Sequence, residues 1–234
     1  MHLNPKYIEV RTFSFFITSN YPNIDKDDLT IISEGYSAKV GNIDDYDALI
    51  QLLHDKNLDL SATADYQELL GYFDEDNYID YMILMIYSGN NDWINSNLRT
   101  WKENKSGGKW RWMLDDVDSG FEIDNVNLNQ FSELSNVSSP AVMNLLFESL
   151  TKNTEFKQKF KTRFLELLDT TFAATNVISV VDAIVDERKD YIALETPKWN
   201  SVTIGAFDLF VSNVKDFVNQ RNAIVRSQLL TFIP

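Results

Sequence analysis

The chain has 234 residues, of which 44% are apolar, so a large packed core is expected rather than disorder. Its 35 acidic and 21 basic residues give a formal net charge of −14, which makes the chain a poor candidate for binding nucleic acid or an anionic membrane, because both require a basic face. The absence of cysteine excludes disulfides, thiol catalysis and thiolate metal sites, and the two histidines are too few for a His-rich zinc site.

Residues 1–30 are predicted to form an N-terminal strand and linker. Residues 7–18 are rich in β-branched and aromatic side chains, which favour a strand. Residues 20–28 contain Pro22 and several Asp and Asn residues, which is typical of a loop. No apolar run in the chain is long enough to span a bilayer, so we expect no membrane insertion by this segment.

Three helices are predicted next. Residues 43–56 and 61–71 place apolar side chains on one face at helical spacing. The third helix, over 75–88, carries apolar side chains all around its axis, and a helix of this kind is buried. We therefore expect residues 75–88 to form the central helix of the domain.

A β-hairpin is predicted after this helix, with strands over 98–102 and 109–114. The turn between them contains Gly107 and Gly108, which can supply the positive φ that tight hairpin turns require. Trp110 and Trp112 share one face of the second strand. They are expected to pack the hairpin onto the helices, and the alternative is a sugar-binding aromatic surface that also includes Trp93 and Trp101.

The remainder of the chain is predicted to be helical. The expected helices cover 140–150, 154–172, 176–194 and 206–232. The expected fold class is therefore α+β and mostly α, with residues 31–234 as a helical body around one small β-hairpin.

Acidic and amide side chains flank the predicted hairpin. Asp92 and Asn97 precede it, and Asp115, Asp116 and Asp118 follow it. Because a hairpin brings its two ends together, we expect these side chains to be neighbours. Carboxylate and amide oxygens suit Mg²⁺ or Mn²⁺, particularly when phosphate oxygens complete the coordination shell.

The order of these residues is that of a protein-kinase catalytic loop. In kinases an Asp that accepts the hydroxyl proton is followed by an Asn that binds metal, in the spacing Asp-x-x-x-x-Asn, and then by a further metal-binding Asp. Asp92 and Asn97 have this spacing, and Asp116 follows the hairpin. A structural Ca²⁺ loop around Asp116 and Asp118 is the alternative, although the distal Glu of an EF-hand is missing.

Two segments resemble the spore-coat protein H (CotH) kinase family of atypical protein kinases. They are Tyr87-Ser-Gly-Asn-Asn-Asp92-Trp-Ile-Asn-Ser-Asn97 and Gly108-Lys-Trp-Arg-Trp-Met-Leu-Asp-Asp116-Val-Asp118-Ser-Gly-Phe121. The later segment Phe217-Val-Asn-Gln-Arg221 is similar to the helical C-terminal part of the family. The resemblance covers roughly residues 30–232.

The resemblance implies a kinase-like large lobe that transfers the γ-phosphoryl group of ATP to Ser or Thr of a protein substrate. Asp92 matches the catalytic Asp, and Asn97 matches the residue that binds metal and nucleotide. Asp116 and Asp118 match the family's paired aspartates, one of which binds Mg²⁺, so the resemblance makes both candidate ligands for Mg²⁺ or Mn²⁺ and Asp116 a candidate for ATP binding. Asp115 stands where the family often has Trp.

No Gly-rich phosphate loop precedes residue 35, so we expect the kinase small lobe to be absent or truncated. An inactive pseudokinase-like binding module of a larger surface protein is therefore a second interpretation. A third is a glycosyltransferase that binds metal through Asp116 and Asp118, which the lack of a parallel-sheet nucleotide domain disfavours. The resemblance leaves the protein substrate, the oligomeric state and an extracytoplasmic or cell-surface location open.

Overall fold

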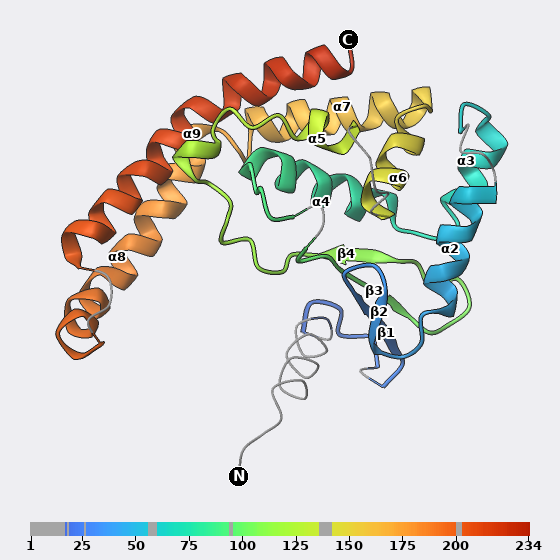
Figure 1. Ribbon diagram of the computed structural model, residues 1–234, viewed down its shortest axis with the longest axis horizontal. Coiled ribbons are helices and arrows are strands. Elements are labelled where there is room, and N and C mark those ends of the chain that lie inside the picture. The colour runs from blue at the N-terminus through green and yellow to red at the C-terminus, as the bar shows by residue number, and fades with distance from the viewer. Residues whose placement is uncertain are drawn as a thin grey trace. The chain divides into compact units, whose positions relative to one another are not determined.

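A computed structural model describes residues 17, 19–25, 27–55, 60–93, 96–135, 142–199 and 203–234 (Figure 1). The strand predicted over 7–18 lies outside these residues except for Ile17. The described residues form two compact units. The first draws on the ranges 1–81, 92–116 and 134–157, and the second on 82–91, 117–133 and 158–234.

The first unit contains a four-stranded antiparallel sheet in the order β2-β1-β3-β4 (Figure 1). Its strands are β1 Leu29–Ser33, β2 Ser37–Val40, β3 Arg99–Glu103 and β4 Arg111–Met113. The predicted hairpin is confirmed as β3 and β4, in which Thr100 lies opposite Trp112.

The prediction of a single hairpin is wrong, because β1 and β2 complete a larger sheet. The segment Thr30-Ile31-Ile32 is β-branched, which favours a strand, and all five residues of β1 are buried. Glu34 and Gly35 both have positive φ, at 56° and 72°, and reverse the chain into β2. Their turn carries no Asn-Gly or Asp-Gly pair, which is the strongest sequence signal for a hairpin.

The four tryptophans in and near the hairpin belong to the core and not to a sugar-binding surface. Trp93, Trp101, Trp110 and Trp112 are all at most 2% exposed. Trp110 packs edge-on against Tyr46 with ring centroids 5.0 Å apart, and Trp112 packs against Tyr78 at 4.7 Å. The expected packing of the hairpin onto helices is therefore confirmed.

The helices predicted in the first half of the chain are confirmed as α2 Asp44–Asp55, α3 Thr63–Leu69 and α4 Glu75–Ser88. Along α4 every side chain from Tyr81 to Ser88 is buried except the partly exposed Leu84. This burial agrees with the predicted central helix. Residues 75–81 of α4 are assigned to the first unit and residues 82–88 to the second, and the helix α6, Val142–Leu150, belongs to the first unit.

The later helices are α7 Thr154–Asp169, α8 Ala174–Trp199 and α9 Ile204–Phe232. Helix α8 was predicted to end near Leu194, but it continues through Pro197 and ends at Trp199. Before the helix predicted over 140–150, the structure adds two short helices that the sequence analysis does not predict, the 3₁₀ helix η1 Ile123–Asn125 and α5 Gln130–Ser135.

No single helix of the described ranges is long and apolar enough to cross a membrane. The bent pair of α7 with residues 174–192 of α8 meets the length and composition criteria when its two helices are taken together.

Candidate functional site

The candidate site lies where the two ends of the β3–β4 hairpin meet. Arg99, the first residue of β3, pairs with Met113, the last residue of β4. The residues just before β3 and just after β4 are therefore neighbours. This pairing places Asp92 and Asn97 on one side of the hairpin base and Asp116 on the other.

The side-chain amide of Asn97 joins these segments. Its Nδ2 donates to Oδ2 of Asp92 at 3.2 Å and to the main-chain oxygen of Asp116 at 3.4 Å. Because the nitrogen faces both acceptors, the amide oxygen points away from them and is available as a ligand atom. The structure thus brings together three of the four predicted site residues.

Two of these residues have left-handed backbone conformations. Asn97 has φ 59° and Asp116 has φ 47°. Asn and Asp tolerate this region better than other residues with a Cβ, although the conformation still costs free energy. The left-handed turns at both ends of the hairpin set the direction in which each side chain leaves the backbone.

Asp118 belongs to the second unit and is exposed. It lies in a turn closed by a hydrogen bond from the Gly120 amide to the Val117 carbonyl at 3.0 Å. The Phe121 amide donates to the carbonyl of Ser88, the last residue of α4, at 2.8 Å. A Cβ on Gly120 would lie 3.2 Å from the Ser88 Cβ, so the turn packs closely on the end of this helix.

Asp115 has a different role from its neighbour. Its carboxylate pairs with Arg99 Nε at 2.9 Å. Arg99 Nη1 in turn donates to Ser33 Oγ and to Glu34 Oε1, both at 2.6 Å. These contacts connect β1, β3 and the end of β4, and sequence reasoning missed Arg99 and Glu34. The Asp115 carboxylate is thus engaged in an ion pair that links strands of the sheet, whereas the Asp116 side chain is exposed.

Trp93 anchors the segment that carries Asp92. It is fully buried, and its indole Nε1 donates to the Tyr81 hydroxyl at 3.0 Å. Burial raises the pKa of Tyr81 well above its ordinary value, so the hydroxyl stays neutral at physiological pH. The buried Trp93 therefore holds the main chain next to Asp92 in place, while the Asp92 side chain itself is exposed.

Arg221 anchors the end of α4 within the second unit. It is fully buried on α9, and its guanidinium donates to the carbonyls of Ile86 and Tyr87 at the end of α4, at 2.6 and 2.9 Å. It also donates to the carbonyls of Val126 and Leu128 at 2.8 and 2.9 Å. Burial lowers its pKa to about 10, so it is still charged at neutral pH.

Only a weak signal in the sequence pointed to Arg221. The family resemblance included this residue, but its role could not be read from spacing. A cation at a helix C-terminus satisfies the free carbonyls and is stabilised by the helix dipole.

The donors at the hairpin base fit a metal that is shared with phosphate. Within the described part of the chain, no three Asp, Glu or His side chains are close enough to hold an ion as a group. Asp92 and Asp116 instead offer exposed carboxylates beside the Asn97 amide. Mg²⁺ characteristically takes one or two protein carboxylates and completes its shell with water and phosphate.

Residues 17–225 match the protein family described as CotH kinase protein. A search of curated proteins finds no match.

Proposed function

The chain belongs to the CotH kinase protein family, and from this premise we propose that it is a kinase-type phosphotransferase that uses ATP and Mg²⁺ or Mn²⁺. Its proposed acceptor is a Ser or Thr hydroxyl of a protein. The observation that supports this proposal best is the Asn97 amide, which connects Asp92 to the main chain of Asp116 across the hairpin base. A kinase site requires a catalytic Asp, a metal-binding Asn and a metal-binding Asp close together.

Asp92 is proposed to orient the acceptor hydroxyl and receive its proton. The hydroxyl oxygen bonds to the γ-phosphorus as the bond to the bridging oxygen breaks, and ADP leaves. The exposed carboxylate of Asp92 is accessible to a protein substrate. The buried indole of Trp93 and the Asn97 amide keep its segment in place, and such positioning accounts for much of phosphoryl-transfer catalysis.

Asn97 and Asp116 are proposed to hold the metal, with Asp118 as a further ligand. When bound, the metal would neutralise negative charge on the phosphate oxygens. Asp115 is not proposed as a ligand, because Arg99 engages its carboxylate. The two adjacent aspartates therefore differ in role: Asp115 forms an ion pair with Arg99, and Asp116 is the proposed metal ligand.

Two readouts on the same variants test the proposal. Incorporation of radiolabelled phosphate from ATP into a generic acceptor protein reports transfer, and calorimetry reports MgATP affinity. Both should use the protein at its natural length. Asp92→Ala should reduce transfer by about 10²–10⁴-fold while sparing MgATP affinity, because general-base catalysis contributes this much. Asp116→Ala should weaken MgATP binding as well.

Asp208→Ala is the matched control, since Asp208 is an exposed carboxylate on α9. It should change neither readout. MgATP binding without any transfer by the unmodified protein would favour the pseudokinase-like binding module. Loss of transfer in all variants including Asp208→Ala would contradict the assigned site.

A further inference from the structure

Helix α8 carries an exposed apolar stripe on one face. The stripe consists of Val180, Ile184, Tyr191 and Leu194, whose exposed fractions are 60%, 54%, 61% and 72%. They are separated by intervals of four, seven and three residues. Intervals of three, four and seven keep side chains on one face of a helix and are the spacing of helix–helix seams.

The stripe continues a face that is part of the core of the second unit. Val177 lies three residues before Val180, and it packs against the buried cluster that contains Val126 and Phe217. On α9, Phe210 lies seven residues before Phe217 and thus on the same face, but it is 58% exposed. Among the described residues, the apolar face is therefore packed against the core at Val177 and Phe217 but exposed at Val180 and Phe210.

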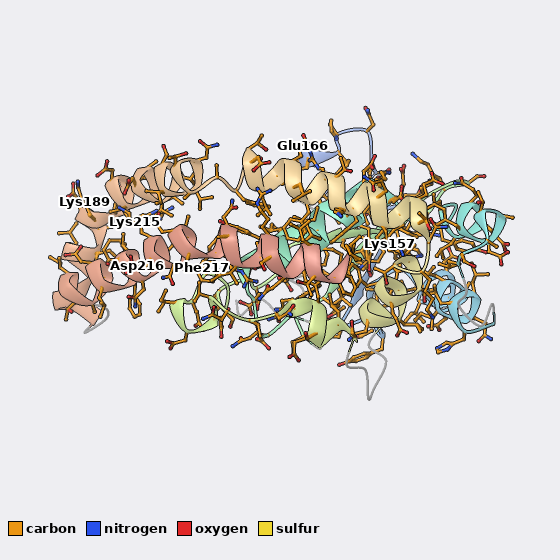
Figure 2. The ribbon with its side chains drawn as sticks, turned by 90° about the horizontal axis from the view of Figure 1, so that it is seen from above. Lys157, Glu166, Lys189, Lys215, Asp216 and Phe217 are labelled. Atoms are coloured by element: carbon orange, nitrogen blue, oxygen red, sulfur yellow. The ribbon has the colours of Figure 1, made fainter. Side chains whose placement is uncertain are left out.

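The two helices that carry this face lie side by side. Lys215 of α9 forms an ion pair with Asp182 of α8. Figure 2 labels Lys189 on α8 and Lys215 and Phe217 on α9, so both helices can be followed there. Each of the described side chains of α8 beyond Ile178 is at least partly exposed. A two-helix hairpin of this kind can complete its packing by adding further helices.

The stripe is self-complementary about its centre. Ile184 and Tyr191 are equidistant from the midpoint between Glu187 and Arg188, and Val180 and Leu194 are nearly so. Glu187 and Arg188, at the midpoint, are 69% and 63% exposed and form an ion pair with each other, 3.6 Å apart, within the single chain. In an antiparallel pair of α8 helices related by a two-fold axis, residues at equal distances from the axis meet.

We propose that a second copy of this chain docks on this stripe through antiparallel pairing of the two α8 helices. Ile184 then meets the partner's Tyr191, and Val180 lies near the partner's Leu194. Glu187 faces the partner's Arg188, and the reverse contact forms by symmetry. If the stripe instead bound a helix of a different protein, opposite charges at the midpoint of α8 would not be needed for the pairing. This inference does not depend on the proposed phosphotransfer.

The charge of the chain opposes this association, because each copy carries a formal net charge of −14. Repulsion between the copies is screened as ionic strength rises. We therefore expect a concentration-dependent dimer that strengthens from low to moderate salt.

Sedimentation velocity over a range of protein and salt concentrations tests the proposal. Ile184→Glu and Tyr191→Glu should each raise the dimer dissociation constant at least about tenfold, because each places a charge in the apolar seam. Far-UV circular dichroism should show unchanged helix content, since both positions are exposed on the single chain.

Exchanging the charges of Glu187 and Arg188 is the more specific test. Glu187→Arg and Arg188→Glu should each weaken the dimer, and the double exchange should restore it. The matched control exchanges Asp186 and Lys189, an exposed ion pair 2.9 Å apart that lies away from the stripe on α8. Neither the control single variants nor the double variant should change the dissociation constant.

A chain that stays monomeric at every concentration and salt would overturn the proposal. So would a dimer that is indifferent to the Ile184 and Tyr191 variants, or a double exchange that fails to restore association lost in both single variants.

Discussion

Arg221→Met should cost the second unit much of its stability. The substitution keeps a long side chain but removes the donors to the main-chain oxygens of Ile86, Tyr87, Val126 and Leu128. Removing one side of a buried charged network costs about 3–5 kcal/mol, because the remaining polar groups lose their partners without regaining water. We therefore expect the free energy of unfolding to fall by about this amount.

Equilibrium urea unfolding followed by far-UV circular dichroism measures this change. Arg226→Met is the matched control, because Arg226 lies on the same helix and forms an ion pair with Asp169 that is partly exposed. Its cost should be about 1 kcal/mol or less. Arg221→Lys should also destabilise, because one nitrogen cannot donate to four separate carbonyls. A cost below about 1 kcal/mol for Arg221→Met would refute the reasoning.

Three further predictions concern the backbone and pH. Asp116→Gly should abolish transfer yet leave thermal stability equal or higher, because glycine accepts the φ of 47° without strain; a clear loss of stability would contradict this. Gly41→Ala should destabilise by more than about 1 kcal/mol in urea unfolding, since its φ is +70° and a Cβ would lie 2.3 Å from Thr30 Oγ1. Burial raises the pKa of Tyr87 to about 12, above its unfolded value of 10.0. The contribution of Tyr87 to stability is therefore complete below about pH 10 and is lost as pH rises toward 12, where Tyr87→Phe should flatten the pH dependence of urea unfolding.

Local sequence patterns predicted the helices and the hairpin well because those elements are determined by short-range periodicity. Apolar side chains all around the axis over 75–88 indicated a buried helix, and α4 is one. Strands β1 and β2 were missed because a sheet is stabilised by contacts distant in sequence. The pairing of Ile31 with Trp101, for example, cannot be read from either segment alone.

The candidate site was predictable to a similar extent. Hairpin geometry was enough to bring Asn97 near Asp92 and Asp116, as the hydrogen bonds of its amide bear out. It could not distinguish Asp115 from Asp116, because only the position of Arg99 across the sheet assigns the Asp115 carboxylate to an ion pair. The role of Arg221 depends on four carbonyls more than ninety residues away, which no local pattern encodes.

The most direct test of the central claim is transfer of radiolabelled phosphate from ATP by the double variant Asp116→Ala/Asp118→Ala. If these aspartates hold the metal that MgATP requires, the double variant should show no transfer above background, whereas Asp208→Ala should retain full activity. Undiminished incorporation by the double variant would contradict the assignment of the metal site at the hairpin base.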